Sequence, residues 1–213
     1  MRIIEPEVKL LAVTPNGEKL IEEAGRTCYL SLDRITDSSE KNFIRSCIKR
    51  RHLSILEHAS ASFRILGASR AFTHQLVRHR LASYSQQSQR YVDETGFNYI
   101  VPPSIDSNGE ATKIFDEFMD YAQKIYGKLK DLGIKREDAR YILPNASESQ
   151  IVFSANFREF RTVFDLRLEK AAQWEIRRVC MKMLKMLQKE ASSVFGYYII
   201  DDVSITAKSE FIR

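Results

Sequence analysis

Apolar and polar residues alternate along some segments of the chain and recur every three to four positions along others. Alternation over residues 1–14 predicts an opening strand, which the Pro15-Asn16-Gly17 turn ends. Residues 59–66 and 151–155 are also predicted strands, and residues 197–205 could add a further strand at the C-terminal end.

Helical spacing of apolar residues predicts helices in most of the remaining chain. They are expected over residues 18–29, from Ser38 or Ser39, from a Ser69 cap towards Arg80, over residues 110–132 with Gly133 as the stop, from an Asn156 cap, and over residues 171–194. The 110–132 helix is expected to turn one apolar face inward, made of Ile114, Phe115, Phe118, Met119, Ala122 and Ile125. Residues 88–99 are expected to be extended, and residues 105–109 to form a loop.

Strands and long helices therefore mix without the strict strand-helix-strand alternation of a doubly wound fold. We expect an α+β protein, a single domain over residues 1–213 with a mixed or antiparallel sheet flanked by long helices. No linker, repeat or low-complexity tract divides the chain, and its length is ample for one core.

The net charge of +5 leaves two classes of partner open, nucleic acids and small anions. Basic residues are spread over the chain and interleaved with acids, which favours small anions and argues against nucleic acid. The apolar runs are too short for a membrane span, and we expect no membrane partner and no secretion signal. Cys28, Cys47 and Cys180 are odd in number and widely spaced, which predicts reduced thiols in a cytoplasmic protein.

The most unusual segment runs from Arg78 to Arg90. It contains three arginines, one histidine, three serines and three glutamines, but neither lysine nor a carboxylate. A solvated helix face would normally mix lysine with glutamate, so this composition indicates a site for an anionic, planar ligand. Gln75 lies three positions before Arg78, and this spacing predicts that both side chains lie on one helix face and point at one ligand.

Several other kinds of site are disfavoured by residue spacing. His74 and His79 are separated by roughly 140° around a helix and so cannot share a metal ion. The glycines are all isolated, so neither a dinucleotide fingerprint nor a P-loop is present. Ser88 lacks an adjacent base and is expected to bind a ligand rather than attack it. The cysteines lie on apolar faces of predicted helices, which favours core packing.

Further segments carry chemistry but also have structural explanations. Residues 52–58 could contact a ligand or supply only a helix cap and a surface histidine. Residues 137–140 could form a salt-bridged turn, and residues 156–159 are equally well explained as a capping box. Arg167 could pair at the surface with Asp165 or Glu169. Singly, these signals are weak.

Taken together, the segments resemble the flavin-dependent thymidylate synthases. The signature of that family is Arg-His-Arg, seven residues, Ser, one residue and Arg, and it stands here as Arg78-His79-Arg80 followed by Ser88-Gln89-Arg90. The other family blocks occur in the same order: His52-x-Ser54-x-x-Glu57-His58, Glu137-Asp138-Ala139-Arg140 before Leu143-Pro144, Asn156-x-Arg158-Glu159, Leu166-Arg167, and Ala172-Gln173-Trp174-Glu175-Ile176-Arg177.

The resemblance implies an α+β fold assembled as a homotetramer, whose subunits share flavin sites that are not of the Rossmann type. It implies the reductive methylation of dUMP to dTMP, with 5,10-methylenetetrahydrofolate as carbon donor, FAD as carrier of reducing equivalents and NADPH as reductant of the FAD. All of these ligands are anionic, which agrees with the arginine-rich segment. The family uses no enzyme nucleophile, so Ser88 need only bind.

Carried over position by position, the resemblance also implies roles for individual residues. Flavin contacts are expected from His52, Ser54, Arg78, His79, Arg80, Gln86, Asn156, Arg158 and Thr162. Contacts to dUMP are expected from Gln75, Arg78, Gln86, Gln87, Ser88, Gln89, Arg90, Arg140 and Arg167. Arg167 is also the expected catalytic residue, because its charge beside the uracil oxygen would stabilise the ring anion that forms as the 5-position becomes nucleophilic.

Two positions depart from the family pattern. Thr162 stands where His or Asn commonly faces the flavin, and a hydroxyl has a shorter reach. Gln86 stands where some members have Glu, so an acceptor is kept and a charge is lost.

Two other classes of function stay open on the residues alone. A non-catalytic nucleotide- or RNA-binding module would keep the anion site without turnover. An assembly protein would use the same arginines only to pair with acids across subunits.

Overall fold

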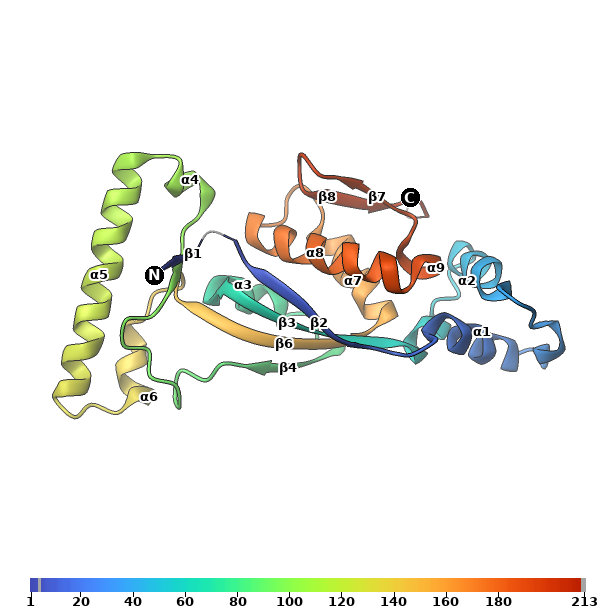
Figure 1. The fold of residues 1–213 in the computed structure, drawn as a ribbon, viewed down its shortest axis with the longest axis horizontal. Helices are drawn as coiled ribbons and strands as arrows, with labels where there is room; N and C mark the ends of the chain where they lie inside the picture. The colour runs from blue at the N-terminus through green and yellow to red at the C-terminus, as the bar shows by residue number, and fades with distance from the viewer. Residues whose placement is uncertain (4, 212–213) are drawn as a thin grey trace. The chain divides into compact units, whose positions relative to one another are not determined.

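The computed structural model describes residues 1–3 and 5–211 of the chain (Figure 1). Its strands are β1 (Arg2–Ile3), β2 (Glu7–Val13), β3 (Ser60–Ser69), β4 (Ala82–Gln86), β5 (Tyr99–Ile100), β6 (Glu148–Asn156), β7 (Tyr198–Asp201) and β8 (Thr206–Ser209). Its α-helices are α1 (Gly17–Thr27), α2 (Ser39–Lys49), α3 (Arg70–Leu76), α4 (Pro103–Asp106), α5 (Gly109–Asp131), α6 (Arg136–Ala139), α7 (Phe157–Arg167), α8 (Trp174–Glu190) and α9 (Ser192–Phe195). Short 3₁₀ helices are η1 (Leu32–Arg34), η2 (Ser54–His58) and η3 (Arg140–Ile142).

In the described residues the strands form one four-stranded sheet and two two-stranded sheets. The larger sheet has the order β2-β3-β6-β4. Strand β1 pairs in parallel with β5, Arg2 lying opposite Tyr99. Strand β7 pairs antiparallel with β8, Tyr198 lying opposite Ser209. Mixed pairing among interspersed helices is the α+β arrangement that the sequence predicts.

The chain folds as two compact units. Unit 1 comprises residues 1–7, 65–78 and 85–151, and unit 2 comprises residues 8–64, 79–84 and 152–213. The chain passes from one unit to the other within several strands, β3, β4 and β6 among them. The expected single domain over residues 1–213 stays a prediction.

Aromatic side chains build the core of unit 2. Phe153 of β6 and Phe160 of α7 meet edge to face with ring centroids 5.1 Å apart, and Phe160 also contacts Phe63 of β3 at 5.5 Å. All three side chains are fully buried. Such pairs add about 0.5–1.5 kcal/mol beyond their buried area. They hold α7, which carries several predicted site residues, against the sheet.

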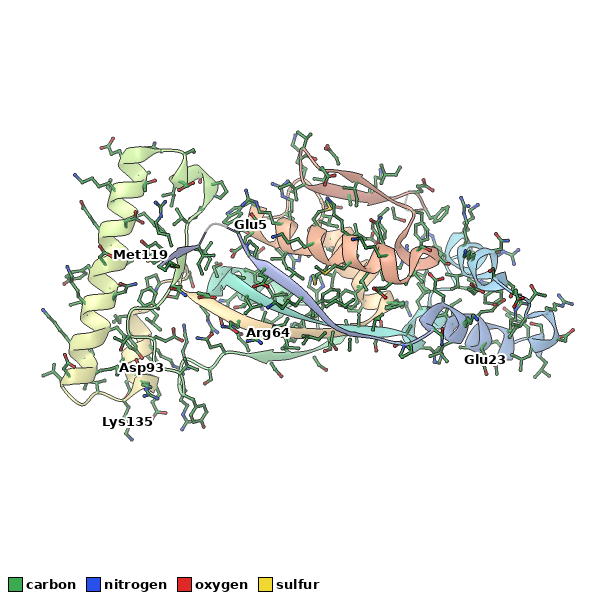
Figure 2. All side chains as sticks on the ribbon, viewed as in Figure 1. Glu5, Glu23, Arg64, Asp93, Met119 and Lys135 are labelled. Atoms are coloured by element: carbon green, nitrogen blue, oxygen red, sulfur yellow. The ribbon has the colours of Figure 1, made fainter. Side chains whose placement is uncertain are left out.

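Helix α5 packs onto unit 1 through only part of its expected face. Two of its buried residues, Met119 and Ala122, join a small cluster around β5 with Phe97, Tyr99 and Val101 (Figure 2 labels Met119). Ile114 and Phe118 were expected to point inward but are 62% and 54% exposed, so that part of the prediction is wrong. The helix carries two apolar stripes offset by one residue, about 100° apart, and periodicity alone does not tell which one is buried.

Most predicted helices are confirmed in type and position. Helices α1, α2, α5 and α7 match the expected segments, Asn108 caps α5, and Gly133 follows its end with φ +80°. The helix predicted over residues 171–194 is two helices, α8 and α9, because the chain leaves helical geometry at Ala191. No helix in the described part of the chain is long and apolar enough to cross a membrane.

The helix predicted from Ser69 begins as expected and ends early. The Ser69 hydroxyl accepts a hydrogen bond from the Phe72 amide at 3.0 Å. Helix α3 ends at Leu76, and the Arg78 amide donates to the Gln75 carbonyl in the turn that follows. The expectation that Gln75 and Arg78 share one helix face is therefore wrong, because Arg78 lies beyond the helix.

Several predicted strand and loop boundaries are also wrong. The opening segment is two strands, β1 and β2, separated by a bend before Pro6, which lacks the N–H that a continuous ladder needs. Residues 88–99 are mainly turns, and the extended stretch lies earlier, in β4. The predicted loop 105–109 begins inside α4, and the C-terminal tail forms a hairpin, β7 and β8, rather than one strand.

Candidate functional site

The residues expected to bind ligands fall into two groups, one in each unit, and one of the points where the chain passes between the units lies between Arg78 and His79. Unit 1 carries Gln75, Arg78, Gln86, Gln87, Ser88, Gln89, Arg90 and Arg140. Unit 2 carries His52, Ser54, His79, Arg80, Asn156, Arg158, Thr162 and Arg167. Most of the expected dUMP contacts therefore belong to unit 1, and most of the expected flavin contacts to unit 2.

In unit 1, Glu137 brings two predicted anion-binding arginines together. Its carboxylate accepts from Nε of Arg90 at 2.7 Å, and its main-chain carbonyl accepts from Nε of Arg140 at 3.1 Å. The ion pair of Glu137 thus reaches outside the 137–140 segment, to Arg90, and within the described segment Arg140 bonds only the main chain of Glu137. The Arg90 side chain is 57% exposed, so its ion pair with Glu137 adds little to the free energy of unfolding. An anionic ligand can take the place of the Glu137 carboxylate beside Arg90.

A tight turn fixes the backbone that leads into Arg90. The Ser88 carbonyl accepts from the amides of Tyr91 and Val92, and the Ser88 hydroxyl accepts from the Arg90 amide at 3.2 Å. Nε2 of Gln89 is buried and has no hydrogen-bond partner in the described structure. A buried donor without a partner is costly, so an acceptor atom of a ligand would fit at this position.

Protein contacts orient the other two glutamines of the segment. Nε2 of Gln86 donates to hydroxyls of Thr73 at 2.9 Å and of Ser149 at 3.0 Å. Nε2 of Gln87 donates to the Glu94 carboxylate at 3.0 Å. Both amides are therefore held in place before any ligand binds.

Sequence reasoning missed two charged residues of this group, Arg70 and Glu94. Burial and the charge of Arg140 lower the pKa of Arg70, and Glu94 opposes that shift. Burial raises the pKa of Glu94, which is 5% exposed. The sequence does contain a signal for Arg70, because it is the first residue of the helix that Ser69 caps. A positive charge at a helix N-terminus is electrostatically unfavourable, which indicates that the arginine is there for a function other than helix stability.

Unit 2 contains a cavity of about 860 Å³ between α1, α2, η2 and the start of α7. Three predicted flavin contacts line it: His52, Ser54 and Arg158. Five arginines line it in all: Arg26, Arg34, Arg50, Arg51 and Arg158. This donor set fits the pyrophosphate of a dinucleotide held by side chains instead of a glycine-rich loop.

Two of the arginines that line the cavity, Arg50 and Arg51, follow directly after α2. Arg51 has a left-handed backbone conformation (φ +61°), and its amide donates to the Ile48 carbonyl. The following residue, His52, opens the predicted block. Arg158 forms an ion pair with Glu57 of η2. The Arg50-Arg51 pair directly before His52 is the feature of the sequence that indicates this arginine-rich lining.

The remaining predicted flavin contacts of unit 2 do not line this cavity. Asn156 is confirmed as a cap, since its side-chain oxygen accepts from the Glu159 amide at 2.8 Å. The Thr162 hydroxyl donates to the Arg158 carbonyl at 3.3 Å, within its own helix. These contacts are structural, and the flavin roles of Asn156 and Thr162 stay predictions.

The cysteines are free thiols in different surroundings. Burial raises the pKa of Cys180 to about 12, which keeps that thiol protonated in the core. Cys28 is exposed just after α1 ends and lines the cavity with Cys47. Core packing was therefore the wrong expectation for Cys28.

The described residues hold no group of three or more His, Cys, Asp or Glu side chains suited to a metal ion.

Arg167, the expected catalytic residue, ends α7 and meets His79. Nε of Arg167 donates to Nε2 of His79 at 3.0 Å, and Glu159 lies 3.6 Å from the other ring nitrogen. His79 is 5% exposed. This contact with a buried histidine differs in kind from the surface pairing with Asp165 or Glu169, which stays an alternative from the sequence.

Comparisons with known proteins show which family this chain resembles in sequence. A family model described as thymidylate synthase complementing protein matches residues 9–192. A flavin-dependent thymidylate synthase of Clostridium tetani is 42% identical over 90% of this chain and 86% of its own length. That of Geobacter sulfurreducens is 41% identical over 89% of this chain and 85% of its own.

A solved structure has the same fold. It is a UMP/dUMP methylase, PolB of Streptomyces cacaoi, bound with 5-Br dUMP. The TM-score is 0.84 at 23% identity, over 92% of this chain and 95% of that one. The fold and the family matches make this chain an enzyme of the methyltransferase class. It belongs to the flavin-dependent thymidylate synthase family, as the ordered sequence blocks predicted.

Proposed function

We propose that the protein converts dUMP to dTMP by reductive methylation, with 5,10-methylenetetrahydrofolate as carbon donor and NADPH-reduced FAD as hydride source. The observation that carries the proposal is that unit 1 and unit 2 each hold arginines in the places where the family blocks predict anionic ligands. The names of the relatives and of the structural neighbour support a flavin and dUMP as ligands.

The cavity of unit 2 supports FAD as the cofactor. His52, Ser54 and Arg158 would hold it, with Arg50 and Arg51 as further cations for its phosphates. We also assign flavin contacts to Arg78, His79, Arg80, Gln86, Asn156 and Thr162, as the family blocks imply. When bound, the flavin supplies a hydride. This mode of binding is not of the Rossmann type, because it uses side chains where that fold uses a glycine-rich turn.

The arginines of unit 1 support dUMP as the substrate. Arg90 and Arg140 would meet the phosphate, and the unpartnered Nε2 of Gln89 would donate to an oxygen of the nucleotide. Gln75, Arg78, Gln86, Gln87 and Ser88 complete the proposed dUMP contacts. Arg167 would stabilise the anionic uracil ring, and a preorganised charge of this kind is typically worth about 10²–10³ in rate.

An exposed apolar stripe on α5 supports assembly into a homo-oligomer, which we propose to be a homotetramer with shared active sites. Ile114, Phe118 and Tyr121 are 62%, 54% and 63% exposed along this helix. Their spacing of four and three residues is that of a helix seam that packs against another helix.

The decisive experiment is a dTMP-forming assay in which dUMP, the folate, FAD and NADPH are omitted in turn. We expect a yellow protein whose dTMP formation requires all four. A colourless protein without flavin affinity or dTMP formation would end the proposal. In that case, oligonucleotide affinity that exceeds dUMP affinity and falls steeply with salt would indicate a non-catalytic RNA-binding module.

A further inference from the structure

His79 differs from both of its neighbours in the Arg78-His79-Arg80 signature. Arg78 and Arg80 are exposed, whereas His79 is only 5% exposed. The main chain of His79 is also held, because the Tyr84 hydroxyl donates to its carbonyl at 2.6 Å. Tyr84 in turn stacks on the core residue Phe153, with ring centroids 5.5 Å apart. The imidazole therefore occupies a fixed position.

Both ring nitrogens of His79 face charged protein groups. Nε2 accepts a hydrogen bond from Nε of Arg167 at 3.0 Å. Nδ1 lies 3.6 Å from a carboxylate oxygen of Glu159, which is also 5% exposed. A carboxylate beside Nδ1 favours the tautomer with its hydrogen there, which leaves the Nε2 lone pair for Arg167.

The contact with Arg167 requires a neutral imidazole. Burial, and then the charge of Arg167, lower the pKa of His79 to about 4. Near neutral pH the ring is therefore uncharged, and the contact with Glu159 is not an ion pair. A protonated ring would carry a hydrogen on Nε2 and would repel the guanidinium.

We propose that His79 is a positioning residue, which holds the guanidinium plane of Arg167 through Nε2 while Glu159 selects the tautomer that can accept. This inference rests on the function proposed above, in which Arg167 stabilises the anionic uracil ring. A guanidinium is planar with its donors in a rigid fork, so fixing Nε fixes the direction of the other N–H groups. A long side chain that ends a helix has several rotamers, and a fixed acceptor favours one of them, which lowers the entropic cost of aiming the charge in each turnover.

The test compares variants of His79 that differ in where they offer an acceptor. Leucine keeps much of the volume and offers none, glutamine places an amide near Nε2, and asparagine places one near Nδ1. We expect His79→Leu and His79→Asn to lower kcat by about 10- to 100-fold, the value of a hydrogen bond to a charged group. His79→Gln should recover most of the loss. Because His79 is also a proposed flavin contact, kcat is expressed per bound flavin, measured by absorbance. The dUMP dissociation constant should stay near that of the unaltered protein.

A double-mutant cycle separates positioning from general damage. In an Arg167→Ala background, His79→Leu should lower kcat no further, because the group it positions is gone. Equal losses in both backgrounds, or an unchanged kcat in the single variant, would overturn the proposal. Loss of flavin from His79→Leu with normal kcat in the flavin-loaded fraction would also overturn it, because His79 would then serve as a flavin contact alone. If the unaltered protein forms no dTMP, the proposed function fails instead, and the binding readouts identify that outcome.

Discussion

Arg90 in unit 1 and Arg167 in unit 2 are held in opposite ways. Arg90 is more than half exposed and pairs with a surface carboxylate, whereas Arg167 is bonded to a buried, neutral histidine. An exposed pair in water is weak and exchangeable, which suits a group that captures and releases a nucleotide. A hydrogen bond inside the protein is expensive to break, which suits a charge that must stay aimed at a reacting ring. If the proposed function holds, this difference separates a substrate-binding arginine from a catalytic one.

The largest expected effect comes from removing the fixed cation. Arg167→Ala should fold, keep its flavin and lose about 10²–10³ in kcat, because the developing ring charge is no longer stabilised. Steady-state dTMP formation and the flavin spectrum measure this. Lys170→Ala removes an exposed cation shortly after α7 and should keep full turnover. Wild-type turnover by the Arg167 variant would refute its catalytic role.

The second effect is on acid stability. The pKa of His79 is lowered from 6.5 to about 4, so the unfolded chain binds a proton that the folded protein does not. The neutral, buried His79 therefore makes the free energy of unfolding depend on pH. Its contribution is fully present above pH 6.5, falls as the pH drops towards 4, and amounts to about 3 kcal/mol.

Urea unfolding at several pH values between 4 and 7 measures this linkage. The free energy of unfolding should fall less steeply with acid in His79→Leu than in the unaltered protein. His74→Leu replaces an exposed histidine and should keep the original slope. Identical slopes for His79→Leu and the unaltered protein would contradict the buried, neutral state of His79.

Substitution of the exposed Arg90 should raise the KM for dUMP more than it lowers kcat. Arg90→Ala should raise the KM for dUMP about tenfold through loss of a charge-assisted hydrogen bond. Its unfolding free energy should change by less than about 0.5 kcal/mol. Glu137→Gln removes the negative charge that faces Arg90 but keeps an acceptor, and it should leave dUMP binding intact or slightly tighter. A weaker oligomer with unchanged dUMP affinity would show instead that Arg90 serves assembly.

The smallest effect is expected at Ser88. Its hydroxyl accepts a backbone hydrogen bond in the turn, so Ser88→Ala should raise the KM for dUMP about 2- to 10-fold and keep measurable kcat. Pre-steady-state dTMP formation tests this directly. Complete loss of activity with intact dUMP binding would make Ser88 a nucleophile.

Local signals in the sequence predicted the parts of the fold that local physics controls. The Ser69 and Asn156 caps and the Gly133 stop lie where predicted, because each satisfies backbone groups at a helix end. The end of α3 was missed because nothing in the sequence before Arg78 stops a helix. The buried face of α5 was missed because two apolar stripes compete for one core.

The sequence by itself identified the family, because the spacing of Arg78, Ser88 and Arg90 and the order of the other blocks are properties of the chain. It also predicted anionic ligands, and that stays a prediction. Only the tertiary structure decided what each polar group contacts. Glu137 joins Arg90 to Arg140, and a buried His79 meets Arg167, because packing brings together residues that are far apart along the chain. Burial also set the protonation state of His79, since the cost of a charge depends on the surrounding protein, which residue order does not specify.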